Sequence, residues 1–331
     1  MFIIAELGNT HEGSVGLAKQ LIQEASLCGV DAVKIQTHIF EAESLSNAPN
    51  PPYFSDETRE EYFTRTSFNL DQYISLKNYS ESECKVEFLS SPFSVEAVGF
   101  LEQVDILRYK VPSGEVTNIP LLECIAATHK PVLLSSGMSP WNDIDLAVRV
   151  LQENGCSDLS ILQCSSRYPC PVEQVGLNVI LELSERYGVP VGFSDHTLGF
   201  AAPFGAAALG AKIIEKHFTL STKMYGSDAK HSMEPKEFRE MVSGLREITK
   251  MLNNPVDKNI AVEDLGDMKV IFEKSIVAST AIKKGDLFTR SNLSVKKPGN
   301  GLPASSFLSV LGKKSNCNIA VNEMISESSF S

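Results

Sequence analysis

Residues 189–219 read VPVGFSDHTLGFAAPFGAAALGAKIIEKHFT, two short apolar strands joined by an alanine- and glycine-rich helical stretch over residues 197–210. Each strand ends in a histidine, the first in His196 and the second in His217. Strands of a strand–helix–strand unit run parallel, so both histidines leave the sheet at the same edge. Each histidine also adjoins acidic or hydroxyl groups. We therefore interpret the pair as ligands of one divalent metal ion rather than as two polar strand ends.

The same pattern of apolar run, polar end and helical stretch recurs along the chain. The runs cover 3–7, 32–37, 86–91, 106–111, 131–136, 159–164, 189–194 and 212–218. Helical periodicity lies between them, at 15–27, 70–84, 119–127, 144–153 and 175–187. Eight parallel strands close a barrel, so the pattern predicts an α/β fold of the (β/α)8 TIM-barrel type rather than a doubly wound open sheet. No GxGxxG or Walker-type glycine loop follows the first run, which excludes the usual nucleotide-binding folds.

The sequence predicts two domains. A barrel is expected over 1–252, a polar linker over 253–274 and a small β-rich domain over 275–331, where short strands and turns replace the helical pattern. Within the barrel, the long second loop, 38–69, carries prolines and aromatic residues. A loop of that length is typical of a segment that covers an active site.

Composition narrows the class of protein. The 331 residues include 30 basic and 41 acidic side chains, and the net charge of −11 argues against nucleic acid or an anionic membrane as a partner. No apolar run approaches the roughly 20 residues of a membrane span, and the first residues do not resemble a signal peptide, so we expect a cytoplasmic protein. The seven cysteines form no CxxC pair, which favours reduced thiols.

Chemistry in a (β/α)8 barrel lies at the carboxyl ends of the strands. The polar residues there are Glu6, Lys34, Gln36, Ser91, Lys110, Ser113, Glu115, Ser135, Cys164, Ser165, Ser194, Asp195, His196, Glu215, Lys216 and His217. Lysines and hydroxyls suit a phosphate-bearing anion, and histidines with a divalent cation suit polarisation of a carbonyl. The set predicts a pocket that joins a small phosphate-bearing molecule to an aldehyde or ketone.

Three rival functions remain open on these residues alone. A Schiff-base aldolase would form an imine on Lys34, Lys110 or Lys216. A related enzyme would condense phosphoenolpyruvate with a phosphorylated pentose or tetrose. A non-catalytic carbohydrate- or ice-binding protein would explain the tail but not the reactive groups at eight strand ends.

Several motifs together resemble the sialic acid synthase family, including its legionaminic acid synthases. In the barrel these are IAELGNTHEG (4–13), VKIQTH (33–38), SPF (91–93), YKVPSGE (109–115), LSSGM (134–138), GFSDHT (192–197) and EKHFT (215–219). In the tail, AIKKG (281–285) and KPGNG (297–301) resemble the family's antifreeze-like (SAF, β-clip) domain. The resemblance implies an enzyme that condenses phosphoenolpyruvate with N-acetylmannosamine or a related acylamino hexose, releasing phosphate.

The resemblance also assigns roles to individual positions. Phosphoenolpyruvate would be held by Lys34, Ser91, Lys110, Ser113, Ser135, Ser166 and Ser194. The amino sugar would lie along Gln36, Glu115, Tyr168 and Asp228. His196 and His217 would ligate manganese, with magnesium or cobalt as alternatives. Glu6 is the candidate that handles the proton of the attacking water, while Glu115 would serve the aldehyde oxygen; the sequence does not order these two.

Two positions depart from the family pattern. Ser166 stands where an asparagine is common among the phosphoenolpyruvate contacts. Lys297 stands where an arginine reaches the acyl group of the sugar from the tail of a partner subunit, and a lysine cannot form the same bidentate fork. Residues 52–59 are closer to relatives that make legionaminic acid. The resemblance therefore implies a domain-swapped homodimer and leaves open whether the sugar is N-acetylmannosamine or 2,4-diacetamido-2,4,6-trideoxymannose.

Overall fold

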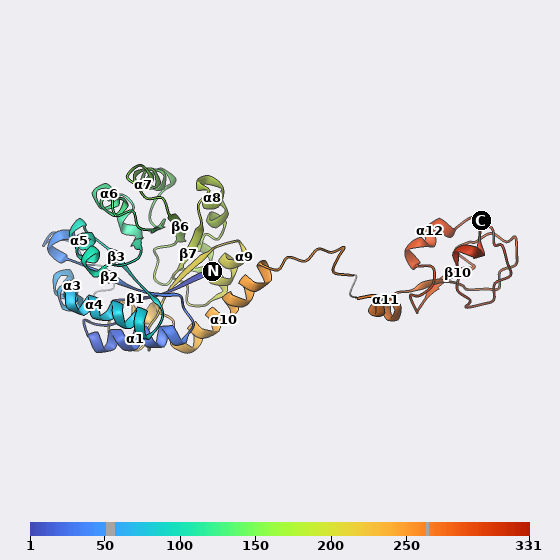
Figure 1. Ribbon diagram of the computed structural model, residues 1–331, viewed down its shortest axis with the longest axis horizontal. Helices are drawn as coiled ribbons and strands as arrows, with labels where there is room; N and C mark the ends of the chain where they lie inside the picture. The colour runs from blue at the N-terminus through green and yellow to red at the C-terminus, as the bar shows by residue number, and fades with distance from the viewer. Residues whose placement is uncertain (51–56, 263–264) are drawn as a thin grey trace. The chain divides into compact units, whose positions relative to one another are not determined.

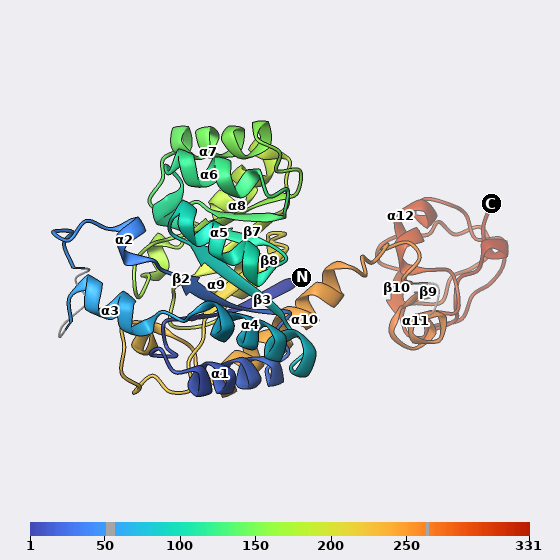
Figure 2. The ribbon, with the colours of Figure 1, turned by 60° about the vertical axis from the view of Figure 1, so that its left-hand side comes forward.

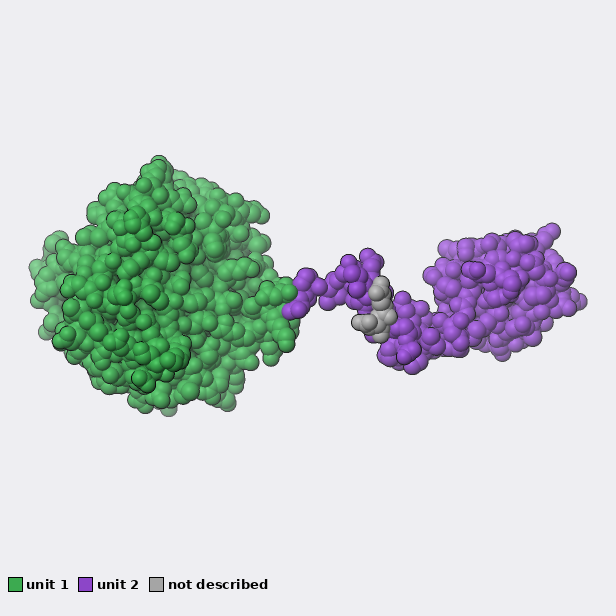
Figure 3. Space-filling model, in the orientation of Figure 1, with its two compact units in different colours: residues 1–253 green, residues 254–331 purple. Residues whose placement is uncertain are grey.

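The computed structural model describes residues 1–50, 57–262 and 265–331. The chain divides into two compact units, residues 1–253 and residues 254–331, which Figure 3 colours separately. Each unit has a hydrophobic core of its own. We describe each unit by itself.

The first unit is a closed barrel of eight parallel strands arranged in chain order (Figures 1 and 2). The strands are β1 Phe2–Gly8, β2 Ala32–Thr37, β3 Glu87–Pro92, β4 Tyr109–Val111, β5 Val132–Ser135, β6 Leu159–Cys164, β7 Val191–Asp195 and β8 Ile213–His217. All eight predicted strands are present, so the (β/α)8 prediction is confirmed. The barrel closes between β1 and β8, where Glu6 lies opposite His217.

Helices surround the strands, with α1 and α4 on one side of the barrel and α6 and α7 on the opposite side (Figure 2). They are α1 Val15–Leu27, α2 Phe40–Glu43, α3 Arg59–Thr66, α4 Leu70–Asn78, α5 Val95–Val104, α6 Ile119–Ala126, α7 Trp141–Glu153, α8 Asn178–Tyr187, α9 Ala201–Ala208 and α10 Pro235–Leu252. The periodicity over 70–84 was expected to give one helix. In the structure, α4 ends at Asn78 and a π-helical turn follows over Tyr79–Glu83.

The segment expected to be a loop over 38–69 contains two helices, α2 and α3. Thr58 begins α3 with a capping box, in which its side chain and that of Glu61 each satisfy a backbone N–H of the other. The buried Tyr62 and Phe63 then hold α3 against the barrel unit. The predicted loop is therefore partly helical, with α2 and α3 inside it. Residues 52–56 of the stretch likened to legionaminic acid synthases lie outside the described residues.

The barrel interior has two layers. Inward-facing apolar side chains form a small cluster of their own, made of Ile4, Ala32, Leu89, Leu133, Leu162 and Ile213. Because side chains alternate along a strand, Glu6 faces the same way as Ile4, and Lys34 the same way as Ala32. The charged residues therefore lie one layer above a hydrocarbon floor, towards the carboxyl ends of the strands.

The second unit is small and β-rich, as predicted. Strands β9 Ser275–Ala278 and β10 Leu293–Lys296 pair antiparallel, and the helices are α11 Gly266–Phe272 and α12 Phe307–Val310. Its core consists of Ile276, Ala278, Ile282, Phe288, Leu293, Val310, Ile319 and Ile325. The stretch expected to be a plain linker, 253–274, contains α11. The apolar cluster and turns between residues close in sequence stabilise the unit.

Two further expectations concern the whole chain. All seven cysteines are free thiols, and only Cys317 is exposed. Among the residues that the structure describes, no helix combines the length and apolar character needed to cross a bilayer.

Candidate active site

A buried lysine, Lys34, organises one half of the charged layer. Its Nζ lies 2.7 Å from Glu6 Oε2 and donates to Ser91 Oγ at 3.0 Å. The Nε2 of Gln36 donates to the other carboxylate oxygen of Glu6 at 2.9 Å. Burial alone would lower the pKa of Lys34, but the carboxylates of Glu215 and Glu6 outweigh it and raise the pKa. Lys34 is therefore a cation at neutral pH, and Glu6 is held by the Gln36 hydrogen bond at one oxygen and the Lys34 ion pair at the other.

A second lysine, Lys110, organises the other half. Its Nζ donates to Glu215 Oε1 at 2.7 Å, and Ser194 Oγ donates to the same oxygen at 3.0 Å. Burial would raise the pKa of Glu215, yet the positive charges of Lys110 and Lys34 hold that pKa well below its usual range. Glu215 stood at a predicted strand end but received no role in the predicted site. The structure shows it as the buried counter-charge of Lys110.

The two histidines lie side by side. Their ring centroids are 5.5 Å apart, and the Tyr168 ring lies 4.1 Å from His196 and 5.8 Å from His217. The Nδ1 of His196 is 2.7 Å from the carbonyl oxygen of Ser165, so it donates there when the other nitrogen carries a lone pair. The Nδ1 of His217 is buried and has no hydrogen-bond partner among the described residues.

These contacts fit two imidazole ligands of one cation. A carbonyl acceptor at one ring nitrogen is the usual way in which a protein fixes the tautomer of a metal-binding histidine. Within the described ranges, no group of three or more histidine, cysteine or acidic side chains could hold a metal ion. A cation at this position would therefore take its remaining ligands from water or substrate oxygens.

A hydroxyl cluster surrounds Gly137, beyond the end of β5. A side-chain carbon at Gly137 would lie 2.5 Å from Ser166 Oγ, 2.7 Å from Ser113 Oγ and 3.1 Å from Cys164 Sγ. Only glycine fits there, and its lack of a side chain allows the two serines to converge. Ser135, the last residue of β5, is also buried and precedes Gly137 in the chain.

The other predicted residues lie at the rim or elsewhere. Glu115 accepts a hydrogen bond from Asn118 Nδ2 at 2.7 Å, and burial raises its pKa above the ordinary value. Asp228, in the loop after β8, accepts the backbone N–H of Asn9 at 3.0 Å. Lys297 belongs to the second unit, where its Nζ lies 5.0 Å from the centre of the Phe272 ring.

Lys216 is one of the polar residues predicted at the strand ends. Its side chain faces away from the charged layer. Its Nζ contacts Asp195 Oδ2 and donates to the Thr197 carbonyl at 2.6 Å. Asp195 and Lys216 are also register partners on β7 and β8. Their ion pair joins the two strands immediately beside His196 and His217, so it positions the histidines and leaves no free amine there.

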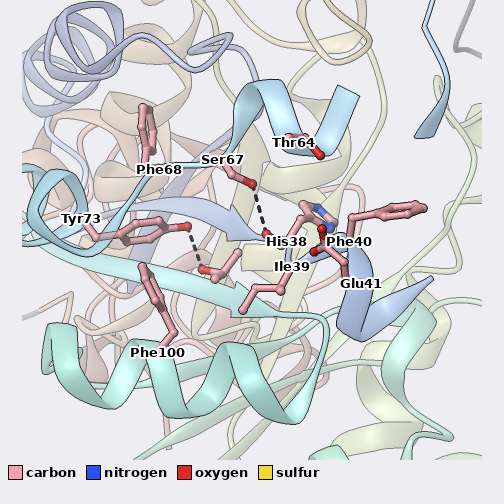
Figure 4. Close-up of a pocket in the computed structure, with 10 residues that line it drawn as sticks. His38, Ile39, Phe40, Glu41, Thr64, Ser67, Phe68, Tyr73 and Phe100 are labelled. Atoms are coloured by element: carbon pink, nitrogen blue, oxygen red, sulfur yellow. Dashed lines mark hydrogen bonds between the residues drawn. The ribbon is translucent and has the colours of Figure 1, made fainter. Parts of the chain in front are cut away.

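A cavity of about 270 Å³ opens beside the end of β2 (Figure 4). It is lined by Thr37, His38, Ile39, Phe40, Glu41, Thr64, Ser67, Phe68, Tyr73 and Phe100. None of the predicted site residues lines it. We place the candidate site at the strand ends instead, because the lysines, carboxylates and histidines converge there and the cavity wall is mostly apolar.

The loop after β1 gives a testable pH dependence of stability. His11 is 1% exposed, Gly13 N–H donates to its Nδ1 at 3.2 Å, and burial lowers its pKa from 6.5 to about 4. The unfolded chain therefore binds an extra proton between these values, so stability is lost as pH falls from about 6.5 to about 4. We expect the free energy of unfolding to drop by about 2 kcal/mol between pH 7 and pH 5 from this residue.

The control variant is His11→Asn, whose amide oxygen can accept the same Gly13 bond but does not titrate. Urea unfolding is followed by the fluorescence of Trp141, the one tryptophan of the chain, which lies on α7 of the barrel. The variant should lose about 2 kcal/mol less than the unaltered protein over the same pH interval. Equal losses in both proteins would show that His11 is not the titrating group.

The structure thus defines a (β/α)8 barrel protein whose strand ends carry buried cations, hydroxyls and a histidine pair. Residues 21–257 match the NeuB family, and residues 273–331 match the SAF domain. The chain belongs to the NeuB family.

Relatives with assigned names agree with that membership. The N,N'-diacetyllegionaminic acid synthase of Campylobacter jejuni is 36% identical over 98% of this chain and 98% of its own. The human N-acetylneuraminate-9-phosphate synthase is 34% identical over 98% of this chain and 91% of its own. Among solved structures, N-acetylneuraminic acid synthetase from Leptospira borgpetersenii is 29% identical, with a TM-score of 0.71 over 81% of this chain and 90% of that chain.

Proposed function

We propose that this protein is a metal-dependent nonulosonic acid synthase, which condenses phosphoenolpyruvate with an acylamino hexose and water to give a nine-carbon sugar acid and phosphate. The observation that carries the proposal is the convergence of Lys34 and Lys110, two buried cations, with the histidine pair at one end of the barrel. Relatives named as legionaminic, pseudaminic and N-acetylneuraminate-9-phosphate synthases support the same class.

The lysines and serines are suited to phosphoenolpyruvate. The substrate carries a phosphate and a carboxylate, and each needs a positive charge and short donors in a site that excludes water. Lys34 and Lys110 supply the charges. The hydroxyls within this layer and around Gly137 supply donors from Ser91, Ser113, Ser135, Ser166 and Ser194.

The carboxylates divide the proton transfers. In the reaction, C3 of phosphoenolpyruvate attacks the aldehyde carbon, water adds at C2, and the C2–O bond to phosphate breaks. Glu6 lies between Lys34 and Gln36 and is the carboxylate placed to accept a proton from the water. Glu115, whose pKa is raised by burial, is suited to hold a proton and give it to the sugar oxygen. A divalent ion bound by the histidines would polarise the aldehyde.

The sugar remains a choice between two substrates. N-acetylmannosamine would make the protein an N-acetylneuraminate synthase, and 2,4-diacetamido-2,4,6-trideoxymannose would make it a legionaminic acid synthase. The Campylobacter legionaminic acid synthase is 36% identical to this chain, the human N-acetylneuraminate-9-phosphate synthase 34% and the Legionella legionaminic acid synthase 32%. The first of these relatives supports the second choice. We also propose manganese as the cation, and a homodimer in which Lys297 of each tail approaches the partner's site.

The rival functions are weakened by the contacts of the lysines. An imine-forming lysine must be neutral. In this structure, Lys34, Lys110 and Lys216 each form an ion pair with a carboxylate, and the pKa of Lys34 is raised. These pairs oppose a Schiff-base aldolase. A purely carbohydrate-binding protein would not need three buried ion pairs at the strand ends.

A phosphate-release assay tests the proposal directly. Purified protein, manganese and phosphoenolpyruvate are mixed with either N-acetylmannosamine or 2,4-diacetamido-2,4,6-trideoxymannose, and inorganic phosphate is measured. We expect release that depends on both the sugar and the metal, and faster release with the diacetamido sugar. Chelator should stop the reaction. Trapping of a pyruvate adduct by borohydride, with no effect of chelator, would instead establish the aldolase mechanism.

A further inference from the structure

A buried histidine outside the predicted site, His38, is connected to Glu6 through Gln36. The Nδ1 of His38 lies 2.9 and 3.0 Å from the two carboxylate oxygens of Glu43. Its Nε2 lies 3.0 Å from Gln36 Oε1, and Gln36 Nε2 donates to Glu6 Oε1 at 2.9 Å. The side chains of His38 and Glu43 are each 6% exposed. A continuous chain of hydrogen bonds therefore runs from α2 to the carboxylate that is placed to receive the water proton.

The donors and acceptors in this chain fix one another. Gln36 turns its NH2 group towards the Glu6 carboxylate and its carbonyl towards His38. An amide carbonyl can only accept, so the Nε2 of His38 must donate. An ionised Glu43 carboxylate can only accept as well, and the Nδ1 of His38 donates to it in that state. The hydrogen-bond pattern thus places an acceptor at each ring nitrogen of His38.

The surroundings of His38 suit a cationic ring. Phe63 stacks on it at 3.8 Å and 15°, and Phe93 at 4.1 Å and 22°. Two rings that are both nearly parallel to the imidazole occupy its opposite faces, and an aromatic face attracts a cation. Glu115 lies close enough for the charge of His38 to lower its carboxyl pKa, although burial dominates. The ring edge meets only acceptors.

His38 also lines the cavity described above. Figure 4 shows the His38 side chain beside Glu41 and Phe40, and Ser67 Oγ donates to the His38 carbonyl at 3.2 Å. Ser67 follows α3, so the turn between α3 and α4 holds the backbone of His38. The segment expected to cover the active site therefore also positions a residue of the hydrogen-bond chain.

We propose that Glu43 and His38 are positioning residues, which fix the amide orientation of Gln36 and so keep its NH2 group donating to Glu6 at the reacting end of the barrel. The proposal rests on the proposed synthase activity for its kinetic consequence, but its structural content does not. Without the His38 proton, the amide is free to turn and would present a carbonyl to the Glu6 carboxylate. That arrangement is repulsive, and Glu6 would lose the hydrogen bond that Gln36 donates to it.

The test combines nuclear magnetic resonance with kinetics. Ring nitrogens of ¹⁵N-histidine-labelled protein are observed at pH 7.5, with the His38 signals assigned by their loss in His38→Phe. We expect both His38 nitrogens to be protonated in the unaltered protein, and we expect Nε2, the nitrogen that faces Gln36, to lose its proton in Glu43→Gln. A neutral His38 ring in the unaltered protein would overturn the proposal, whatever the activity of the enzyme.

The kinetic arm uses phosphate release. Glu43→Gln should lower kcat by about tenfold while leaving the KM for phosphoenolpyruvate unchanged, since misplacement of a supporting group typically costs at least that factor. Glu41→Gln, on the same short helix but exposed, is the matched control and should keep the kcat of the unaltered protein.

Rescue separates positioning from folding. His38→Gln retains a side-chain amide that can donate to Gln36, and so should retain more activity than His38→Phe, which keeps the aromatic stack but no donor. Equal losses in these two variants, or a normal kcat in Glu43→Gln, would overturn the proposal. If the unaltered protein released no phosphate with any acylamino hexose, the proposed function would fail, while the resonance experiment would still decide the role of His38.

Discussion

Replacing His217 with alanine should reduce phosphate release by about a thousandfold or more, because polarisation by a metal ion contributes several kcal/mol to a carbonyl addition. His196→Ala should have an effect of the same size. Both imidazoles lie at the strand ends with ring centroids 5.5 Å apart, and the described residues offer no third side chain to replace either ligand. We expect the loss to appear in kcat over a wide range of manganese concentrations.

A direct binding measurement distinguishes this loss from misfolding. Titration calorimetry with manganese alone should show one site per chain in the unaltered protein and no measurable binding in either variant. Trp141 fluorescence should report urea unfolding midpoints close to that of the unaltered barrel. The control variant is His129→Ala, which removes an exposed histidine that is not a proposed metal ligand. It should bind manganese normally. Full activity of His196→Ala or His217→Ala in metal-free buffer would remove the metal from the proposal.

The second large effect concerns the buried pair of Lys110 and Glu215. Lys110→Met should lower the free energy of unfolding by about 3–5 kcal/mol, because it leaves the Glu215 carboxylate buried without its partner. It should also abolish phosphate release, since one of the two cations proposed for phosphoenolpyruvate is gone. The variant by itself does not separate these two losses.

The double variant Lys110→Met/Glu215→Leu separates them. Replacing a buried ion pair by apolar side chains of similar volume is often neutral or stabilising, so most of the lost stability should return. Phosphate release should stay absent, because the cation does not return. Urea unfolding followed by Trp141 fluorescence gives the first measurement, and the phosphate assay gives the second. Activity in the double variant would show that Lys110 does not hold the substrate.

The sequence was sufficient for the architecture of the barrel because each strand is an apolar run with a polar end. Prediction from the sequence is less accurate where a buried residue takes no part in the hydrogen-bonded pairing of a strand. The run over 106–111 predicted a full strand, yet β4 covers only Tyr109–Val111. Ile106 is buried outside the ladder, and Leu107 is 53% exposed. An apolar run thus indicates neither burial of every residue nor strand pairing.

The same distinction applies to the site. Glu6 and Lys34 are register partners on neighbouring strands, so their ion pair follows from strand order. Lys110 and Glu215 lie on β4 and β8, which are not neighbours, and only closure of the barrel brings them together. His38 was absent from the predicted site because its role depends on a turn of α2 that returns Glu43 to it.

The apolar cluster beneath the charged layer leaves the barrel interior open towards the carboxyl ends of the strands. Among the described residues, the apolar cluster that includes Ile4 and Leu162 fills the barrel on the amino-terminal side of the charged layer, so the strand ends are the side from which molecules approach. Lys34 and Lys110 are held directly above that floor, whereas Glu115 lies at the rim. Under the proposed roles, the molecule that the lysines hold must arrive before the sugar covers it. The position of the lysines below the rim thus implies that the two substrates bind in a fixed order.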